Sequence, residues 1–123
     1  GAPDMRTPIS YALTFPDRAP RPQETFRLTD HPVLAFAEVD RTKYPALDLA
    51  YDCLARGGTA ACTMNGANEE AVAAFLCDEI GICAIPDLIE AALDKTETVY
   101  QPQLSDILEA DRLAREVVRE KLN

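Results

Sequence analysis

The sequence has few of the residues and motifs that usually carry chemistry. It contains one histidine, His31, and no Cys-x-x-Cys pair, although structural zinc needs four Cys or His ligands at closely paired spacings. It has no glycine-rich phosphate loop, no His-Glu-x-x-His motif and no nucleophile elbow. The 123 residues taken alone therefore support no complete catalytic machinery.

Basic residues and long apolar runs are also scarce. The chain has 12 Lys and Arg residues against 21 Asp and Glu residues, which gives a formal net charge of −9. Such an acidic surface repels phosphate backbones and anionic lipids, so we expect neither nucleic acid nor a membrane as a partner. No stretch approaches the roughly 20 apolar residues that a membrane-spanning helix needs.

The four cysteines follow no metal-binding or disulfide pattern. Cys53, Cys62, Cys77 and Cys83 are separated by nine, fifteen and six positions. Three of them fall within or beside apolar helical stripes, where a free cysteine behaves as a small hydrophobic residue. We therefore expect reduced thiols in the core of a cytoplasmic protein.

The first third of the chain shows mixed patterns. Residues 7–14 suit a short helix, with Thr7-Pro8 as N-cap and first helical residue. Residues 16–32 hold four of the nine prolines and little periodicity, which indicates an extended linker. Residues 33–39 (VLAFAEV) are the one good strand candidate. A single strand must pair with something outside this sequence, pair with another copy, or lie exposed.

From residue 42 onward the pattern is helical. One helix should run from Pro45 to Arg56, with Leu47, Ala50, Tyr51 and Leu54 turned inward. A second follows the run at residues 65–69 and closes at Gly81, a third begins at Pro86, and a fourth covers residues 104–122. About four amphipathic helices with short connections predict a small antiparallel bundle. The predicted fold is mainly α: a helical bundle at 42–123 preceded by an extended linker with one strand.

Three further residues, Asn65, Asn68 and Asp111, are candidates for helix caps. Asn65 or Asn68 would cap the second helix, and Glu69 would lie in its first turn, where the helix dipole favours negative charge. These amides could instead face a ligand, but capping already accounts for the residue types. Asp111 falls on the apolar stripe of the last helix, so we expect a break there with Asp111 as the cap of a second segment.

The opening run, Gly1 to Ile9 (GAPDMRTPI), has the composition of an active-site loop, with Gly and Pro for a fixed path and Asp and Arg for charge. It predicts that the chain is part of a larger protein. Together with Asn-x-Ala-Asn-Glu at 65–69, the run resembles the C-terminal portion of the 1-deoxy-D-xylulose 5-phosphate reductoisomerase family. The segments at 44–50 (YPALDLA) and 111–115 (DRLAR) are similar to that family too.

The resemblance implies an enzyme that rearranges 1-deoxy-D-xylulose 5-phosphate and reduces the product with NADPH, in the presence of a divalent metal such as Mg or Mn. The product is 2-C-methyl-D-erythritol 4-phosphate, an isoprenoid precursor. Family members are homodimers with a dinucleotide-binding domain, a catalytic domain and a C-terminal helical bundle. Residues 1–41 would then end the catalytic domain and form the linker, and residues 42–123 would be the bundle.

The resemblance assigns two contact residues, Pro3 and Met5, which would pack near the nicotinamide and the substrate. It leaves this chain without catalytic residues, metal ligands or a cofactor of its own. Gly66 departs from the family, which usually has Ala there. Glycine beside a helix start costs up to about 1 kcal/mol, so we expect a looser turn at this position.

Two functional hypotheses follow. The first is a non-catalytic helical domain that supports the active site of a reductoisomerase, with the upstream domains as its partners. The alternative is an independent, acidic helical module for protein interaction. The segment at 33–39 separates them, because a family strand should seek a β-partner outside this chain, whereas a stand-alone module should bury it internally.

Overall fold

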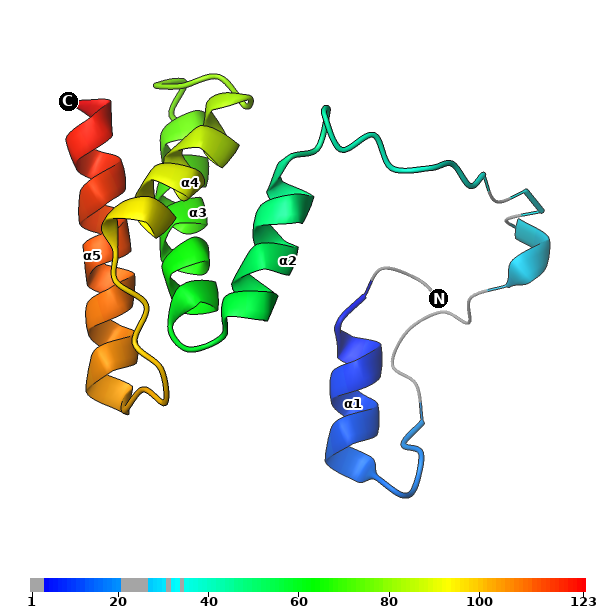
Figure 1. Ribbon diagram of the computed structural model, residues 1–123. Helices are drawn as coiled ribbons and strands as arrows, with labels where there is room; N and C mark the ends of the chain where they lie inside the picture. The colour runs from blue at the N-terminus through cyan, green and yellow to red at the C-terminus, as the bar shows by residue number, and fades with distance from the viewer. Residues whose placement is uncertain (1–3, 21–26, 31, 34) are drawn as a thin grey trace. The chain divides into compact units, whose positions relative to one another are not determined.

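The computed structural model divides the chain into two compact units, Gly1–Glu38 and Val39–Asn123 (Figure 1). From the sequence we expected the division after residue 41. The residues that the structure describes are 4–20, 27–30, 32–33 and 35–123. In them, all regular secondary structure is helical, which confirms the mainly α fold.

The first unit contains helix α1 (Arg6–Thr14) and the short 3₁₀ helix η1 (Leu28–Asp30). The predicted helix at 7–14 is therefore confirmed. Its proposed cap, Thr7, is wrong, because the helix begins one residue earlier and Met5 occupies the N-cap position. The side chain of Asp4 supplies a hydrogen-bond acceptor at this end of the helix: its Oδ1 accepts the Arg6 backbone N–H at 2.9 Å. A carboxylate placed there also complements the helix dipole.

The strand predicted at 33–39 does not form in the part of that segment that the structure describes. Val33, Phe36 and Val39 are 82%, 90% and 53% exposed. A strand needs a neighbour to accept and donate its backbone hydrogen bonds, and none is available among the described residues. Apolar alternation alone predicted the strand and carried no information about such a neighbour.

The second unit is a bundle of four helices (Figure 1). Helix α3 lies at its centre and packs against α5, α4 and α2, and α4 also packs against α5. The predicted bundle of about four helices is therefore confirmed. The bounds of the helices are α2 (Ala46–Arg56), α3 (Ala60–Leu76), α4 (Ala84–Lys95) and α5 (Leu104–Leu122).

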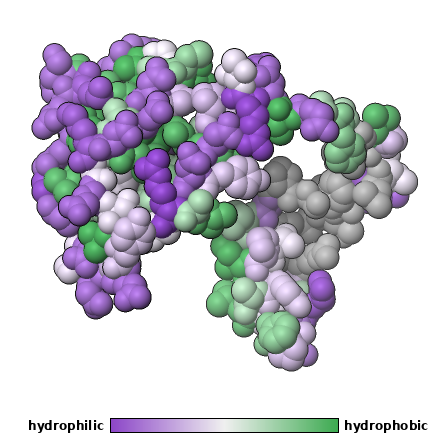
Figure 2. All heavy atoms as spheres, in the orientation of Figure 1, coloured by the Kyte–Doolittle hydropathy of each residue, from purple (hydrophilic) through white to green (hydrophobic). Residues whose placement is uncertain are grey.

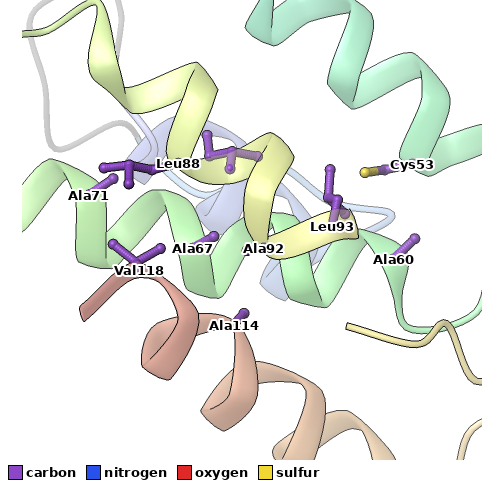
Figure 3. Packing of buried hydrophobic residues seen from close by; sticks show 10 residues of the cluster. Cys53, Ala60, Ala67, Ala71, Leu88, Ala92, Leu93, Ala114 and Val118 are labelled. Carbon is purple, nitrogen blue, oxygen red and sulfur yellow. The ribbon is translucent and has the colours of Figure 1, made fainter. Parts of the chain in front are cut away.

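The core forms where small residues of α3 meet larger residues of the other helices (Figure 3). The side chains of the alanines on α3 end at Cβ, so neighbouring helices approach closely and their aliphatic side chains fill the space between the helices. From α4 come Ile89 and Leu93, at 1% and 5% exposure. The other members of the buried cluster are Cys53, Ala60, Ala67, Ala71, Leu88, Ala92, Ala114 and Val118.

Helix α3 begins earlier than predicted, at Ala60, and ends at Leu76 rather than near Gly81. The start is set by Gly57 and Gly58, which both have positive φ, 70° and 54°. A Cβ at Gly58 would lie 2.3 Å from the Val99 carbonyl oxygen, so only glycine fits there. Thr59 then bonds twice to Val99, through its N–H (3.1 Å) and its Oγ1 (3.0 Å). Asn65 and Asn68 therefore lie inside the helix and cap nothing.

Helix α5 runs without interruption through Asp111, so the predicted break and cap there are wrong. The buried stripe consists of Ala110, Ala114 and Val118, spaced four residues apart. Ala114 and Val118 lie on the apolar stripe expected for this helix, whereas Leu108, which was also expected on it, is 63% exposed. Small residues at these positions let α5 approach α3, which is why the larger leucine is not the buried one.

The inward face predicted for helix α2 is only partly correct: Leu47 and Ala50 are half-buried. Tyr51 and Leu54 are 56% and 77% exposed, whereas Cys53 is buried at 2% and Leu49 packs against the core. Helix α4 begins at Ala84, so Pro86 lies in its first turn, where a missing N–H costs nothing.

All four cysteines are free thiols, as predicted, but only Cys53 belongs to the core. Cys62 is half-buried between α3 and α5, where its thiol donates to the Ile107 carbonyl oxygen at 3.3 Å. Burial raises the pKa of the Cys62 thiol. Cys77 and Cys83 are exposed in the α3–α4 connection. In the described part of the chain, no helix is long and apolar enough to cross a membrane.

Candidate functional sites in the N-terminal loop and between α3 and α5

The first candidate site is the N-terminal loop. Pro3 lies outside the described residues. Met5 is 70% exposed at the start of α1. Arg6 holds the carboxylate of Asp4 with its Nε at 3.0 Å and its Nη2 at 2.6 Å. This pair fixes the direction in which the chain enters α1, and the adjacent Met5 offers a flexible apolar surface that could form the wall of a pocket.

The second candidate site is an ion-pair network between α3 and α5, centred on Arg115. Within α5, Arg115 Nε donates to Asp111 Oδ2 at 2.8 Å and Nη2 donates to Asp111 Oδ1 at 3.0 Å. Across to α3, Nη2 donates to Glu69 Oε2 at 2.6 Å. The other oxygen of Glu69 accepts the Asn65 side-chain amide at 3.1 Å. Asn65 and Glu69, which the sequence pattern presented as cap and first turn, thus belong to one interhelical network.

One turn further along, Arg119 and Glu70 repeat the arrangement. Arg119 Nε and Nη2 donate to the two oxygens of Glu70 at 2.7 and 2.8 Å, a bidentate pair across the two helices. Arg115 Nη1 lies 3.9 Å from Glu70 Oε2 and links the two pairs. A bidentate pair fixes relative orientation as well as distance, so the network sets the register of α5 on α3.

Each carboxylate of this network is paired with an arginine. The hydrogen bond from Arg115 lowers the pKa of Glu69, with a smaller contribution from Asn65, and the same guanidinium lowers the pKa of Asp111. The two carboxylates in turn raise the pKa of Arg115. Both acids are therefore ionised at neutral pH and engaged by a cation, which leaves neither poised for proton transfer.

Gly66 lies where α3 packs directly against Asp111 of α5. A Cβ on Gly66 would lie 2.8 Å from Asp111 Oδ1 and 3.1 Å from the Asp111 carbonyl oxygen. The expectation of a looser turn at Gly66 is therefore wrong, because Gly66 is buried inside a helix whose neighbour packs directly against it. The missing side chain leaves room for the Asp111 carboxylate to reach Arg115.

The acidic side chains of this network hold α3 and α5 together and do not converge on a shared site. Asp111, Glu69 and Glu70 each hold an arginine rather than point at a common centre. Among the described residues, no group of three or more His, Cys, Asp or Glu side chains could hold a metal ion.

Sequence reasoning missed the role of the two arginines. The segment at 111–115 was recognised only as a pattern, and Arg119 was not singled out. The available signal was the spacing: Asp111, Arg115 and Arg119 lie four residues apart, on one side of a helix. The spacing does not identify the carboxylate on α3 that Arg115 binds, because Glu69 is 46 positions away from Arg115 in sequence.

These features define a four-helix domain built on an alanine-rich central helix and tied together by interhelical ion pairs, preceded by a separate unit with an exposed short helix. The chain belongs to the family described as the DXP reductoisomerase C-terminal domain, whose match covers residues 1–117.

Curated relatives and solved structures agree with this assignment. The chain is 46% identical over 125 residues to 1-deoxy-D-xylulose 5-phosphate reductoisomerase from Synechococcus sp. (strain CC9605), covering 100% of the chain and 30% of the relative. It is similar to the Zymomonas mobilis enzyme solved with NADPH, with a TM-score of 0.85, 36% identity, and coverage of 100% and 32%. Another structure, solved with NADPH, fosmidomycin and magnesium, gives a TM-score of 0.85, 30% identity, and coverage of 99% and 32%.

The chain thus spans about a third of the length of the proteins it matches. The remaining two thirds of those relatives have no counterpart in these 123 residues.

Proposed function

We propose that this chain is the C-terminal part of an NADPH-dependent reductoisomerase that converts 1-deoxy-D-xylulose 5-phosphate to 2-C-methyl-D-erythritol 4-phosphate in isoprenoid biosynthesis. The observation that carries this proposal is the match over residues 1–117 to a family of that name. It is supported by relatives of the same name that are similar over the whole chain, and by neighbours solved with NADPH and magnesium.

The two units have different roles in this proposal. Residues 42–123 are a structural, non-catalytic bundle, since the charged groups of the α3–α5 network are engaged with one another. Residues 1–41 end the catalytic domain and form the linker, with Pro3 and Met5 against the nicotinamide and substrate. A hydride transfer needs a dry pocket wall, and an exposed Met5 at a helix start can supply one.

NADPH and the divalent metal, Mg or Mn, bind upstream of this chain in the proposal. They supply the hydride and the polarisation of the substrate oxygens respectively. The whole protein is a homodimer in the cytoplasm, where the four free thiols remain reduced.

Activity of the full-length protein tests the proposal. We expect the full-length protein to oxidise NADPH only when 1-deoxy-D-xylulose 5-phosphate and Mg²⁺ or Mn²⁺ are present, and the isolated 123-residue chain to show no turnover and no tight NADPH binding. A full-length protein that leaves the substrate unchanged would overturn the assignment. Turnover by the isolated chain would overturn the non-catalytic role.

A substitution at Met5 tests the pocket contact. In the full-length protein, Met5→Ala should lower kcat/KM by roughly tenfold, equivalent to about 1.4 kcal/mol of transition-state stabilisation. Leu54→Ala is the matched control, because Leu54 is similarly exposed, at 77% against 70% for Met5, but lies in the bundle. Equal kinetics for the two variants would remove Met5 from the pocket.

A further inference from the structure

The Asp4 carboxylate and Arg6 form a hydrogen-bonded unit around Met5. Asp4 Oδ1 accepts the Arg6 backbone N–H at 2.9 Å, two residues further along the chain. The Arg6 side chain folds back onto the same carboxylate, with its Nε donating to both oxygens at 3.0 Å and its Nη2 donating to Oδ2 at 2.6 Å. An acidic side chain that binds the N–H two residues further on forms an Asx turn. Met5 is the middle residue of this turn.

Backbone hydrogen bonds on both sides hold Met5 in line with helix α1. The Asp4 carbonyl oxygen accepts the Thr7 N–H at 3.3 Å, and the Met5 carbonyl oxygen accepts the Ile9 N–H at 3.2 Å. Met5 itself has helical dihedral angles, with φ −65° and ψ −18°. Its backbone is therefore fixed by Asp4 on one side and by α1 on the other.

Burial does not set the direction of the Met5 side chain. Met5 is 70% exposed, and Ile9 and Leu13 of the same helix are 52% and 81% exposed. Figure 2 shows hydrophobic residues along one edge of the part of the molecule that contains α1. A methionine has three rotatable side-chain bonds, so an exposed one is directed by the backbone that carries its Cβ. The turn made by Asp4 therefore sets the point from which the Met5 side chain extends.

The Asp4–Arg6 pair is better suited to fixing geometry than to stabilising the fold. The Arg6 side chain is 71% exposed and that of Asp4 is 24% exposed, and ion pairs at exposed positions contribute little stability. A guanidinium that holds both oxygens of a carboxylate does fix its orientation. Arg112 and Glu109 of α5 form a pair of the same kind, with Nε and Nη2 donating to the two oxygens at 2.8 and 2.6 Å. Because that pair lies in the bundle, it is a matched control.

We propose that Asp4 and Arg6 are positioning residues for Met5: the Asx turn places the Met5 backbone, and the Arg6 guanidinium holds the Asp4 carboxylate in the turn. The inference rests on the proposed function, under which Met5 packs against the nicotinamide and the substrate. Asp4 and Arg6 then act only through Met5. A displacement of about 1 Å in a group that orients a reactant can lower a rate by about a hundredfold, so a fixed Met5 favours hydride transfer.

Kinetics of substituted full-length proteins test whether Asp4 acts through Met5. Asp4→Ala should lower kcat/KM roughly tenfold, the loss expected for Met5→Ala. The double variant should lose no more than Met5→Ala alone, because the two residues belong to one unit. Asp4→Asn keeps an acceptor for the Arg6 N–H and should stay within about threefold of the unsubstituted protein. Additive losses in the double variant, or an Asp4→Asn variant as impaired as Asp4→Ala, would overturn the inference.

Two further variants separate the ion pair from the turn. Arg6→Gln keeps the backbone N–H of the turn but loses the guanidinium, so kcat/KM should fall by about threefold. Glu109→Ala breaks the matched pair on α5 and should leave kcat/KM unchanged. Unchanged kinetics in Arg6→Gln would remove Arg6 from the positioning unit, and an equal loss in Glu109→Ala would overturn the role of the Asp4–Arg6 pair.

Methionine methyl NMR tests the positioning without turnover. In the full-length protein labelled with ¹³C at the methionine methyl groups, Met5→Ala identifies the Met5 signal by its loss. Asp4→Ala should move that signal toward the position of free methionine, whereas Glu109→Ala should not. An unmoved signal in Asp4→Ala would overturn the inference, and if Asp4→Ala fails to fold, Arg6→Gln takes its place. A signal that moves in a protein without reductoisomerase activity would retain the positioning and overturn only the proposed function.

Discussion

Helices α1 and α3 differ in a way that side-chain hydrophobicity does not predict. Helix α1 contains Met5 at its cap, Ile9 and Leu13, yet none of them is buried. Helix α3 buries six residues, and every one of them is small: Ala60, Thr63, Gly66, Ala67, Ala71 and Ala74. Burial requires a neighbour, and the small residues of α3 have neighbours on three sides because they allow close approach.

The same contrast separates the two units. Between residues 4 and 38, no residue whose burial the structure describes is buried, whereas all members of the core lie between Cys53 and Val118. The stability of the described chain should therefore reside in the second unit. Each experiment below changes one side of this contrast, from the largest expected effect to the smallest.

Removing a large side chain from the core should have the greatest effect. Ile89 is 1% exposed and belongs to the core on α4, which packs against α3 and α5, so Ile89→Ala should lower the free energy of unfolding by about 2–5 kcal/mol. Leu54→Ala, at an exposed position of α2, should change it by less than about 0.5 kcal/mol. Urea unfolding followed by circular dichroism measures both. Similar losses for the two variants would mean that the core is not where the structure places it.

Adding a methyl group between α3 and α5 should have the next largest effect. Gly66→Ala gains about 1 kcal/mol of helix propensity but must displace Asp111, at an overpacking cost of about 1–3 kcal/mol. We expect a net loss of about 1 kcal/mol in the free energy of unfolding. Gly81→Ala is the control, since a Cβ there meets nothing within 4 Å.

A double-mutant cycle then locates the cause. In a protein that carries Asp111→Ala, the cost of Gly66→Ala should be smaller, because one of the two crowded oxygen atoms is gone. An unchanged cost would assign the whole effect to the α5 backbone.

Breaking the interhelical network should destabilise the bundle less than crowding α3 against α5 does. Arg115→Gln removes the hydrogen bond that reaches from α5 to Glu69 on α3. Arg112→Gln removes only contacts within α5, to Glu109 and Glu116, and should lower the melting temperature less, because exposed ion pairs contribute little to stability. Equal losses in thermal unfolding would contradict the structural role of the network.

The network should also make stability depend on pH. The pKa values of Glu69 and Asp111 are lowered in the folded protein, so their contribution is fully present above the unfolded pKa values and is lost as pH falls through the folded ones. The melting temperature should therefore decrease from about pH 5 downward. In Arg115→Gln this decrease should be shallower, because the carboxylates have lost their partner. Melting curves between pH 3 and pH 7 measure it, with Arg112→Gln as the reference.

Deleting the first unit should have the smallest effect on the bundle. A protein starting at Thr42 should unfold cooperatively, with a melting temperature within about 4 °C of the full 123-residue chain, because the described residues before position 39 bury nothing. Loss of cooperative unfolding by circular dichroism would show that the bundle depends on the preceding residues.

The helix content of the bundle and its division into four helices were predictable from the sequence. Each helix has its own apolar periodicity, and glycine or proline residues separate it from the next. The faces were predicted less well. In α2 the larger Tyr51 and Leu54 suggested the inward face, but the buried residue is Cys53. In α5 the presence of Asp111 suggested a break, but the carboxylate is held at the helix edge by Arg115.

The sequence by itself determined the mainly α fold, the short helix at the N-terminus, the free thiols and the family, since these depend on local pattern or on motifs of consecutive residues. The tertiary structure decided the helix faces, the start of α3 and the use of Asn65, Glu69 and Asp111. Those outcomes depend on which residues meet across helices, as Thr59 meets Val99 and Glu69 meets Arg115. A pattern read along one helix contains no information about the neighbour that completes it.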